Sequence, residues 1–481
     1  MLLRRKNRLA GACMSALIGC VSLVGCLVNE GIDPPRGVLN FPVQLEALTL
    51  EGDVAPRILY VANSNFDLLY NAATLQAYDL EVANRMIDEG CAEAISGRCA
   101  VIPKDSVYLD FDAANLTLVE ADEPLLLSEV FISSYTQDMK LSPRGDTLYL
   151  SVQGDGDITH VRLGERGELQ CGSVEPCDAH FRSTDRTTLA DDLSFPMGPM
   201  GLYVGTLDEL GLEEGSGNYI LVADRDGSIS LLIDRLREGE QPFVTDILPE
   251  LGPESSPTLA RDPHTGVVWA PALNGSYIGR VIPAIDSATD PAQLLEARLD
   301  RLAGFNVWDL NVGGSADIRQ VIFDPRPGRH QVYLLARSPS ALIIADRRGD
   351  FGSRTGPGLI PTGIIDLGTG PSRMAVERFE VDGEELLLGF VTSFDSRDLY
   401  VVDLDRGELL SVAAGLSGPF DFLIDKARRR IYLVDYHTSV ISFIDLEPMF
   451  GCLEGNLAID DECTPTVLGT IGVPNALEGL R

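Results

Sequence analysis

Carboxylates recur in the short polar segments between apolar runs, where several of them could gather around one cation. Carboxylate oxygens are ligands that Ca²⁺ prefers. The candidate ligands are Asp155, Asp157, Asp224, Asp226, Asp395 and Asp435. Aspartate and glycine also populate tight β-turns for backbone reasons, and Asp224-x-Asp226-Gly227 lacks the rest of a calcium loop. We therefore predict that these aspartates are turn residues, selected for backbone reasons. The alternative is that they bind Ca²⁺, and no other cofactor is predicted.

The same segments hold one candidate for acid–base chemistry. The chain contains five histidines, and only His437 falls in these segments, beside Asp435 and Tyr436. Such a histidine can act as a general acid or base; the alternative is a polar loop residue. No G-x-S-x-G elbow, P-loop or H-E-x-x-H motif occurs. We predict no catalytic residue and favour a binding protein over an enzyme.

The polar segments follow one type of strand that occurs seven times. Each occurrence is a short apolar run flanked by turn residues, as expected of a β-strand. The seven runs are 57–63, 147–151, 219–224, 267–270, 332–336, 386–391 and 430–435. A shorter strand precedes each run, and a third strand follows it. Five of the third strands end in an apolar residue followed by aspartate, at Asp79, Asp234, Asp346, Asp403 and Asp445.

Seven units of four antiparallel strands predict a closed ring. An open sheet of this size would expose long apolar edges, whereas radial closure into a propeller protects them. We predict an all-β fold, a seven-bladed β-propeller of four-stranded antiparallel blades over 41–475, with a C-terminal tail over 476–481. The polar segments then lie together on one face, around the mouth of the channel. The pattern does not indicate how the ring closes.

The second strands resemble a known repeat. Tyr60-Val61-Ala62-Asn63 and its counterparts are similar to the YVTN-type propeller repeat of bacterial surface and envelope proteins, which is related to lactonase-like propellers. The resemblance covers nearly all of 41–475 and implies the propeller fold. Propellers with this repeat include enzymes and adhesion modules, so the fold does not fix the function.

The N-terminus predicts export and lipidation. Basic residues before position 9 precede an apolar stretch too short to span a bilayer, which is typical of a secretory signal. Leu23-Val24-Gly25-Cys26 resembles the lipobox of bacterial lipoproteins; an ordinary signal peptide that contains cysteine is the alternative. We predict a signal peptide over 1–25, lipidation of Cys26 and a tether over 26–40. Leu27 in place of aspartate implies sorting to the outer membrane of a Gram-negative host, with the protein on its periplasmic or surface face.

The remaining cysteines fall into three local pairs. These pairs are Cys91/Cys99, Cys171/Cys177 and Cys452/Cys463. Six cysteines allow fifteen connectivities, and the local pairing is the simplest. Zinc is the competing interpretation, but no pair has the CxxC spacing and only His180 lies close to any of them. Disulfides require an oxidising compartment, which agrees with export.

The charge balance restricts the partners. The formal net charge is −34, so nothing neutralises phosphates and nucleic acid is not an expected partner. We predict a monomeric, membrane-anchored envelope propeller that acts as a binding or scaffold module for a protein or a glycan. The alternative is a lactonase-like hydrolase or isomerase with a divalent metal at the channel mouth.

Overall fold

The protein is described from a computed structural model. It describes residues 32–95, 97–104, 106, 115–154, 156–171, 177, 198–213, 215–236, 241–251, 256–273, 275–285, 297–307, 316–348, 358–455 and 463–474. Cys26, the expected signal peptide and Asp155 lie outside these residues. Within the described ranges, no helix is long and apolar enough to cross a membrane.

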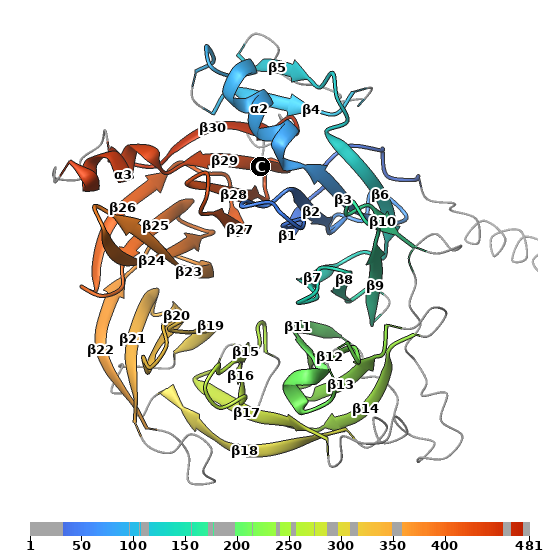
Figure 1. Ribbon diagram of the computed structural model, residues 1–481, viewed down its shortest axis with the longest axis vertical. Helices are drawn as coiled ribbons and strands as arrows, with labels where there is room; N and C mark the ends of the chain where they lie inside the picture. Colours follow the sequence, from blue (N-terminus) through green and yellow to red (C-terminus); the bar gives the residue numbers. More distant parts are fainter. Residues whose placement is uncertain are drawn as a thin grey trace, which may run out of the picture.

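The described strands form a propeller whose sheets are arranged around a central axis (Figure 1). Six sheets are four-stranded and antiparallel, with their strands in chain order from the axis outward. In the first sheet the outer strand is the sixth of the chain, because the fourth and fifth strands join the last sheet. The first sheet contains β1 (Pro42–Leu48), β2 (Ile58–Asn63), β3 (Ala73–Asp79) and β6 (Leu126–Ile132). The second contains β7 (Thr136–Leu141), β8 (Thr147–Val152), β9 (Asp157–Leu163) and β10 (Leu169–Gln170).

The next four blades repeat this arrangement. The third contains β11 (Pro199–Thr206), β12 (Asn218–Asp224), β13 (Ile229–Asp234) and β14 (Phe243–Leu248), with the 3-10 helix η1 (Leu207–Leu210) after β11. The fourth contains β15 (Ala260–Arg261), β16 (Val268–Pro271), β17 (Tyr277–Ala284) and β18 (Arg298–Asn306). The fifth contains β19 (Asp317–Phe323), β20 (Gln331–Ser338), β21 (Ala341–Arg348) and β22 (Gly358–Asp366). The sixth contains β23 (Pro371–Val381), β24 (Glu384–Ser393), β25 (Asp398–Asp403) and β26 (Glu408–Ala414).

The last sheet departs from the prediction, because it has six strands. Thus the described residues form six four-stranded blades rather than the seven predicted. The strands of this sheet are β27 (Pro419–Asp425), β28 (Arg430–Asp435), β29 (Val440–Asp445), β30 (Thr466–Ile471), β4 (Cys99–Ile102) and β5 (Thr117–Glu120). The first four are antiparallel neighbours, whereas β4 pairs parallel with β30 and β5 pairs parallel with β4. Helix α3 (Glu447–Glu454) follows β29.

The ring closes through this sheet. The chain leaves the first blade after β3, forms helix α2 (Leu80–Gly90), and then adds β4 to the outer strand β30, with Ala100 opposite Thr470. Asp79 caps α2, because its carboxylate accepts the amides of Glu81 and Val82. At the inner edge, the amide of Leu45 on β1 donates to Asp421 on β27 over 2.9 Å. The first blade and the last sheet therefore meet in one joint, at the top of Figure 1.

The second strand of each sheet is the buried centre of its blade, as predicted. Its tyrosine is fully buried in five of the sheets, at Tyr60, Tyr149, Tyr219, Tyr333 and Tyr432. The hydroxyl groups find acceptors, since that of Tyr432 donates to Asp425 over 2.7 Å and that of Tyr149 to Asp234 over 2.6 Å. The recurrent tyrosine is therefore structural: its ring fills the blade and its hydroxyl finds a protein acceptor.

The residues expected to form a tether lie partly on the propeller. The amide of Gly37 donates to the carboxylate of Glu129, and Leu39 is buried. Ile32 forms a parallel bridge with Tyr70. Residues 32–40 therefore pack on the first blade, and only 26–31 remain between Cys26 and the packed chain.

Candidate anion-binding site at the channel mouth

The inner strands begin with a bulge that turns side chains toward the channel. The register shifts within the first few residues of β1, β7, β11, β19, β23 and β27. A bulge bends the strand and redirects a side chain, and bulges are common beside functional sites. Here the bulged segments place Gln137, Met200, Arg319, Arg373 and Phe420 around one hollow.

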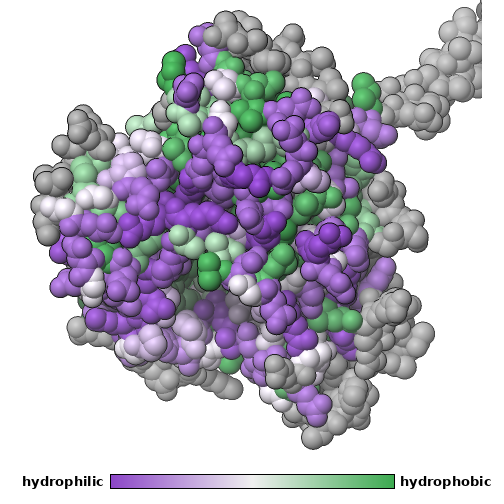
Figure 2. Space-filling model, turned by 45° about the horizontal axis from the view of Figure 1, so that its top comes forward, coloured by the Kyte–Doolittle hydropathy of each residue, from purple (hydrophilic) through white to green (hydrophobic). Residues whose placement is uncertain are grey.

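This hollow is a cavity of about 310 Å³ at the mouth of the channel. Its size is at the lower end of the range for small-molecule sites, about 300–1,000 Å³. The inner-strand residues form part of its wall. The end of the second strand β20 supplies Arg337, and loops between second and third strands supply Leu273, Phe394 and Asp395. Figure 2 shows a hollow at the centre of the face, surrounded by hydrophilic side chains with hydrophobic ones at its rim.

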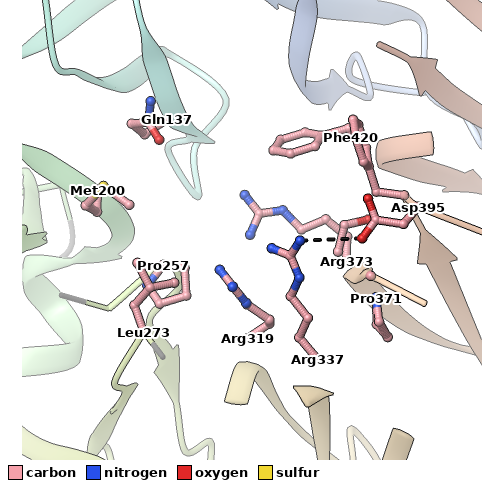
Figure 3. Close-up of a pocket in the computed structure, with 13 residues that line it drawn as sticks. Gln137, Met200, Pro257, Leu273, Arg319, Arg337, Pro371, Arg373, Asp395 and Phe420 are labelled. Carbon is pink, nitrogen blue, oxygen red and sulfur yellow. Dashed lines mark ion pairs between the residues drawn. The ribbon is translucent and has the colours of Figure 1, made fainter. Parts of the chain in front are cut away.

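Three arginines point into this cavity from neighbouring strands (Figure 3). Arg319 lies on β19, Arg337 on β20 and Arg373 on β23. Arg337 pairs with Asp395 at 3.5 Å, and Arg319 pairs with Asp317 at 2.8 Å. Arg373 lies 3.9 Å from Asp421. The cavity therefore concentrates positive charge in a strongly acidic chain.

Arg319 has a lowered pKa despite its close ion pair. Burial lowers this pKa, and the charges of Arg337 and Arg373 lower it further, against the opposing effect of Asp317. Within the part of the chain that the structure describes, its buried Nε has no hydrogen-bond partner. A partly buried guanidinium beside two other cations favours an incoming anion, which would offset the repulsion.

Gly370 fixes the position of the one acidic residue in the wall. This glycine has a φ of +71°, and a Cβ at this position would lie 2.2 Å from Oδ2 of Asp395. A side chain there would displace Asp395 and with it the partner of Arg337. The glycine therefore allows the carboxylate and the guanidinium to remain at the edge of the cavity.

The opposite wall is apolar. Met200, Pro257 and Leu273 face the arginines across the cavity (Figure 3). Phe420 stacks near Phe394, with ring centres 6.1 Å apart and the planes almost perpendicular. The cavity thus offers guanidinium groups to an anion and an apolar surface to the body of the same ligand.

A second cavity, of about 200 Å³, lies deeper in the channel and shares Arg373 with the first. Lys140 lies here between Asp138, at 2.9 Å, and Glu46, at 3.7 Å. Burial raises the pKa of Glu46 to about 7, with a further increase from Asp421 and Asp138 and an opposing effect of Lys140. Burial also raises the pKa of Asp421. This cavity therefore contains a carboxyl group that exchanges its proton near neutral pH.

The predicted cation ligands are distributed over separate blades. Among the residues that the structure describes, no three His, Cys, Asp or Glu side chains are grouped to hold a metal ion. Asp224 accepts from Ser230, and Asp435 accepts from the amide of Ser417 and the hydroxyl of Ser442. Asp226 accepts the amide of Ser228. These carboxylates are therefore hydrogen-bonded to nearby serines.

Two of these aspartates have distinctive surroundings. Burial raises the pKa of Asp224 to about 8, helped by Asp226 and opposed by the serine hydroxyls. Asp395 alone lines the arginine cavity. Asp157 begins β9, and its carboxylate accepts the amide of Ile158.

The histidine considered for acid–base chemistry lies in an aromatic cluster. The ring of His437 is 4.8 Å from that of Phe394 and 5.7 Å from that of Tyr436. The amide of His437 donates to the carbonyl of Ser417. The structure thus places His437 beside the candidate site as part of its aromatic rim.

The three cysteine pairs are disulfides, as predicted. The Cα atoms are 5.6 Å apart in Cys91–Cys99, 5.2 Å in Cys171–Cys177 and 5.9 Å in Cys452–Cys463. Cys91–Cys99 joins the end of α2 to β4, so it reinforces the joint at which the ring closes.

The arginine cluster was not predicted from the sequence. Arg319 and Arg373 are each the third residue of an inner strand, in adjacent blades. An alignment of the repeats by this position would have placed both on the channel mouth. The aspartates at the ends of the third strands were easier to recognise in the sequence than these arginines, although they are structural residues.

No protein-family model matches the chain, and no curated protein matches its sequence. Among solved structures, a propeller from Bacteroides fragilis described as "a putative 6-phosphogluconolactonase" is similar over 91% of this chain and 99% of its own, with 13% identity and a TM-score of 0.50. The periplasmic gluconolactonase of Pseudomonas aeruginosa is similar over 82% and 88%, with 14% identity and a TM-score of 0.47. The similarity to the Bacteroides fragilis structure shows a β-propeller fold.

Proposed function

We propose that this chain is a membrane-anchored envelope propeller that binds an acidic sugar at the mouth of its channel. The observation that carries the proposal is the convergence of Arg319, Arg337 and Arg373 in one cavity. Guanidinium groups bind carboxylates through paired, charge-assisted hydrogen bonds. The apolar wall opposite them suits the carbon face of a sugar ring. This proposal specifies the glycan partner that the sequence analysis anticipated.

Calorimetric titration of the purified full chain with D-glucuronate and with D-glucose tests this proposal. The two sugars differ in one carboxylate, so the arginine cavity should bind glucuronate at least about tenfold more tightly, the effect of one charge-assisted hydrogen bond of roughly 1.5–3 kcal/mol. Equal affinities for the two sugars, or no binding of glucuronate, would contradict the proposal.

The anchor is a separate part of the proposal and has its own test. Cys26→Ala removes the thiol that lipidation requires, so the variant should leave the membrane fraction or remain as an unprocessed precursor of greater mass. Membrane fractionation with mass measurement distinguishes these results from the wild type. Unchanged fractionation together with unchanged mass would refute the anchor.

A second candidate is hydrolysis of a sugar lactone. Glu46 supports it, because a carboxyl whose pKa is about 7 can act as a general base at neutral pH. It lies in the deeper cavity, which shares Arg373 with the binding cavity. The structural neighbour described as a 6-phosphogluconolactonase shares only the fold, so it does not assign this activity.

Turnover of D-glucono-δ-lactone measured at pH 6, 7 and 8 tests the second candidate. If Glu46 is the base, the enzymatic rate should rise through about pH 7 and Glu46→Gln should lower it by about 100-fold or more. A wild-type rate no greater than that of spontaneous hydrolysis would reject hydrolysis without affecting the binding proposal.

A further inference from the structure

The loop between β2 and β3 exposes large apolar side chains at one corner of the channel-mouth face. Phe66, Leu68 and Leu69 are each more than half exposed. Ile32, which is also largely exposed, lies beside this loop through its bridge to Tyr70. Together, Ile32, Phe66, Leu68 and Leu69 are called the apolar corner. Apolar side chains exposed singly are common, but such a group in one loop indicates an interaction site.

The loop is held in this conformation by polar contacts beneath it. Asn65 is buried, and its side chain donates to the carbonyl of Tyr70 over 2.7 Å and to the hydroxyl of Ser134 over 2.9 Å. The carboxylate of Asp67 accepts the amide of Leu69. Leu68 has a φ of +54°, which is uncommon for a residue other than glycine. The fold therefore maintains an unfavourable backbone conformation while leaving Leu68 and Leu69 exposed.

Aromatic rings connect the apolar corner with the rest of the face. The ring of Phe66 lies 5.9 Å from that of Tyr135 and 6.3 Å from that of Tyr436. Tyr436 in turn lies 5.8 Å from Phe394, at the edge of the arginine cavity. Tyrosine is enriched where proteins meet the headgroup region of a bilayer.

The position of the anchor identifies the occupant of this surface. Cys26 precedes Ile32 by six residues, and an extended chain spans at most about 3.6 Å per residue, so the lipid-bearing end lies within about 22 Å of Ile32. A folded chain of this length has a radius of gyration of roughly 22–23 Å. The bilayer therefore lies on the side of the propeller that carries Ile32, which is where the apolar corner lies.

We infer that the apolar corner contacts the lipid bilayer and turns the channel-mouth face toward the membrane surface. This inference rests on the lipid anchor proposed above. The net charge of −34 would repel anionic lipids, so the contact is with the apolar and zwitterionic part of the interface. The arginine cavity then opens close to the membrane surface.

Quenching of tryptophan by bromine-labelled lipid tests this contact. The full, lipidated chain is reconstituted into phosphatidylcholine vesicles with or without bromine on the acyl chains. Leu69→Trp reports on the apolar corner. Val54→Trp is the matched control, because Val54 is 93% exposed in the β1–β2 turn of the same blade. Native tryptophan fluorescence, which includes that of the buried Trp269, is subtracted with the wild-type protein.

We expect brominated lipid to reduce the added Leu69→Trp signal roughly twofold, because interfacial side chains lie about 5–10 Å into the boundary between headgroups and acyl chains. The Val54→Trp signal should not change. In a Leu68→Asp background, Leu69→Trp should lose its quenching while the protein still floats with the vesicles. Flotation without Leu69→Trp quenching would overturn the inference and leave the anchor intact. Failure to float would overturn the anchor and the inference with it.

Discussion

The arginine cavity carries the opposite charge from the chain as a whole. It is formed by Arg319, Arg337 and Arg373. Their guanidinium groups lie in one cavity although the chain carries a net charge of −34. Burial, together with the like charges of Arg337 and Arg373, lowers the pKa of Arg319, so holding its charge in the cavity costs free energy. Groups whose pKa is shifted by burial and by like charges cluster at functional sites. A bound anion would offset this cost.

Glu46 gives the stability of the propeller a pH dependence. Burial raises its pKa from 4.5 to about 7, so between these values the folded protein holds a proton that the unfolded chain has released. The resulting stabilisation is complete below about pH 4.5 and is lost as the pH rises through about 7. Glu46→Gln removes this ionisation, so its free energy of unfolding should fall less between pH 5 and pH 8 than that of the wild type.

Urea denaturation at the two pH values measures this difference. Glu51→Gln, a change at an exposed carboxylate in the β1–β2 turn of the same blade, serves as the control and should behave as the wild type does. The same pH dependence in Glu46→Gln and in the wild type would show that the folded protein does not hold this proton.

Neighbouring blades are joined by buried charges, and one such joint gives a stability prediction. Asp262, in the β15–β16 turn, accepts from Arg347 on β21 over 2.5 Å, and both side chains are almost fully buried. Burial alone would raise the pKa of Asp262, but hydrogen bonds from the amide of His264 and from Arg347 lower it. Asp262→Ala would leave Arg347 buried without this carboxylate and should cost about 3–5 kcal/mol.

The free energy of unfolding in urea checks this value. Arg166→Ala breaks the exposed ion pair with Glu168 and should change stability by no more than about 0.5 kcal/mol. A loss below about 1 kcal/mol in Asp262→Ala would mean that the two blades do not depend on this pair.

The outer joint of the ring should depend on its disulfide. Cys91–Cys99 closes a loop with a sequence separation of 8 residues, and removing such a crosslink costs about 2.5 kcal/mol by the loop-entropy relation. We expect the double variant Cys91→Ala/Cys99→Ala to lose about this much stability and to exchange the amides of β4 faster. Hydrogen exchange followed by mass spectrometry measures the effect on β4.

Cys171→Ala/Cys177→Ala provides the matched control, since it removes a disulfide of similar loop length that is not part of the joint. Its β4 amides should exchange as in the wild type. Unchanged exchange in both variants would show that pairing with β30 alone holds β4 in place.

The sequence predicted the elements whose residues are close together in the chain. All seven second strands are present, and β28 spans Arg430–Asp435 as expected. The six-stranded sheet was missed, because β4 and β5 join it through parallel pairs between residues far apart in the chain. Helix α2 was not predicted, because Asp79 was interpreted only as the end of a strand. An aspartate before an apolar periodic run also signals the N-terminus of a helix.

The candidate site was less predictable than the fold, because its residues are also far apart in the chain. A turn aspartate such as Asp224 is recognisable from its neighbours, whereas the arginine cavity is made of single residues from β19, β20 and β23. Only the ring geometry and the bulges at the starts of the inner strands bring these residues together. No short motif encodes such a site.

At the scale of the whole molecule, the acidic surface, the arginine cavity and the apolar corner fit one arrangement. The acidic charge favours solubility and repels other anions from most of the surface. The cavity is where three cations are presented together. The anchor and the apolar corner, as proposed, would hold this cavity near the membrane surface, where acidic saccharides of the envelope would reach it.

The proposed binding function requires that an acidic sugar binds in the arginine cavity. The most direct measurement is calorimetric titration of D-glucuronate into the wild type, Arg337→Ala and Arg166→Ala. Arg337 is 45% exposed, so its removal should leave the fold intact. The account predicts a loss of affinity of about tenfold or more in Arg337→Ala and none in Arg166→Ala. Wild-type affinity in Arg337→Ala would contradict it.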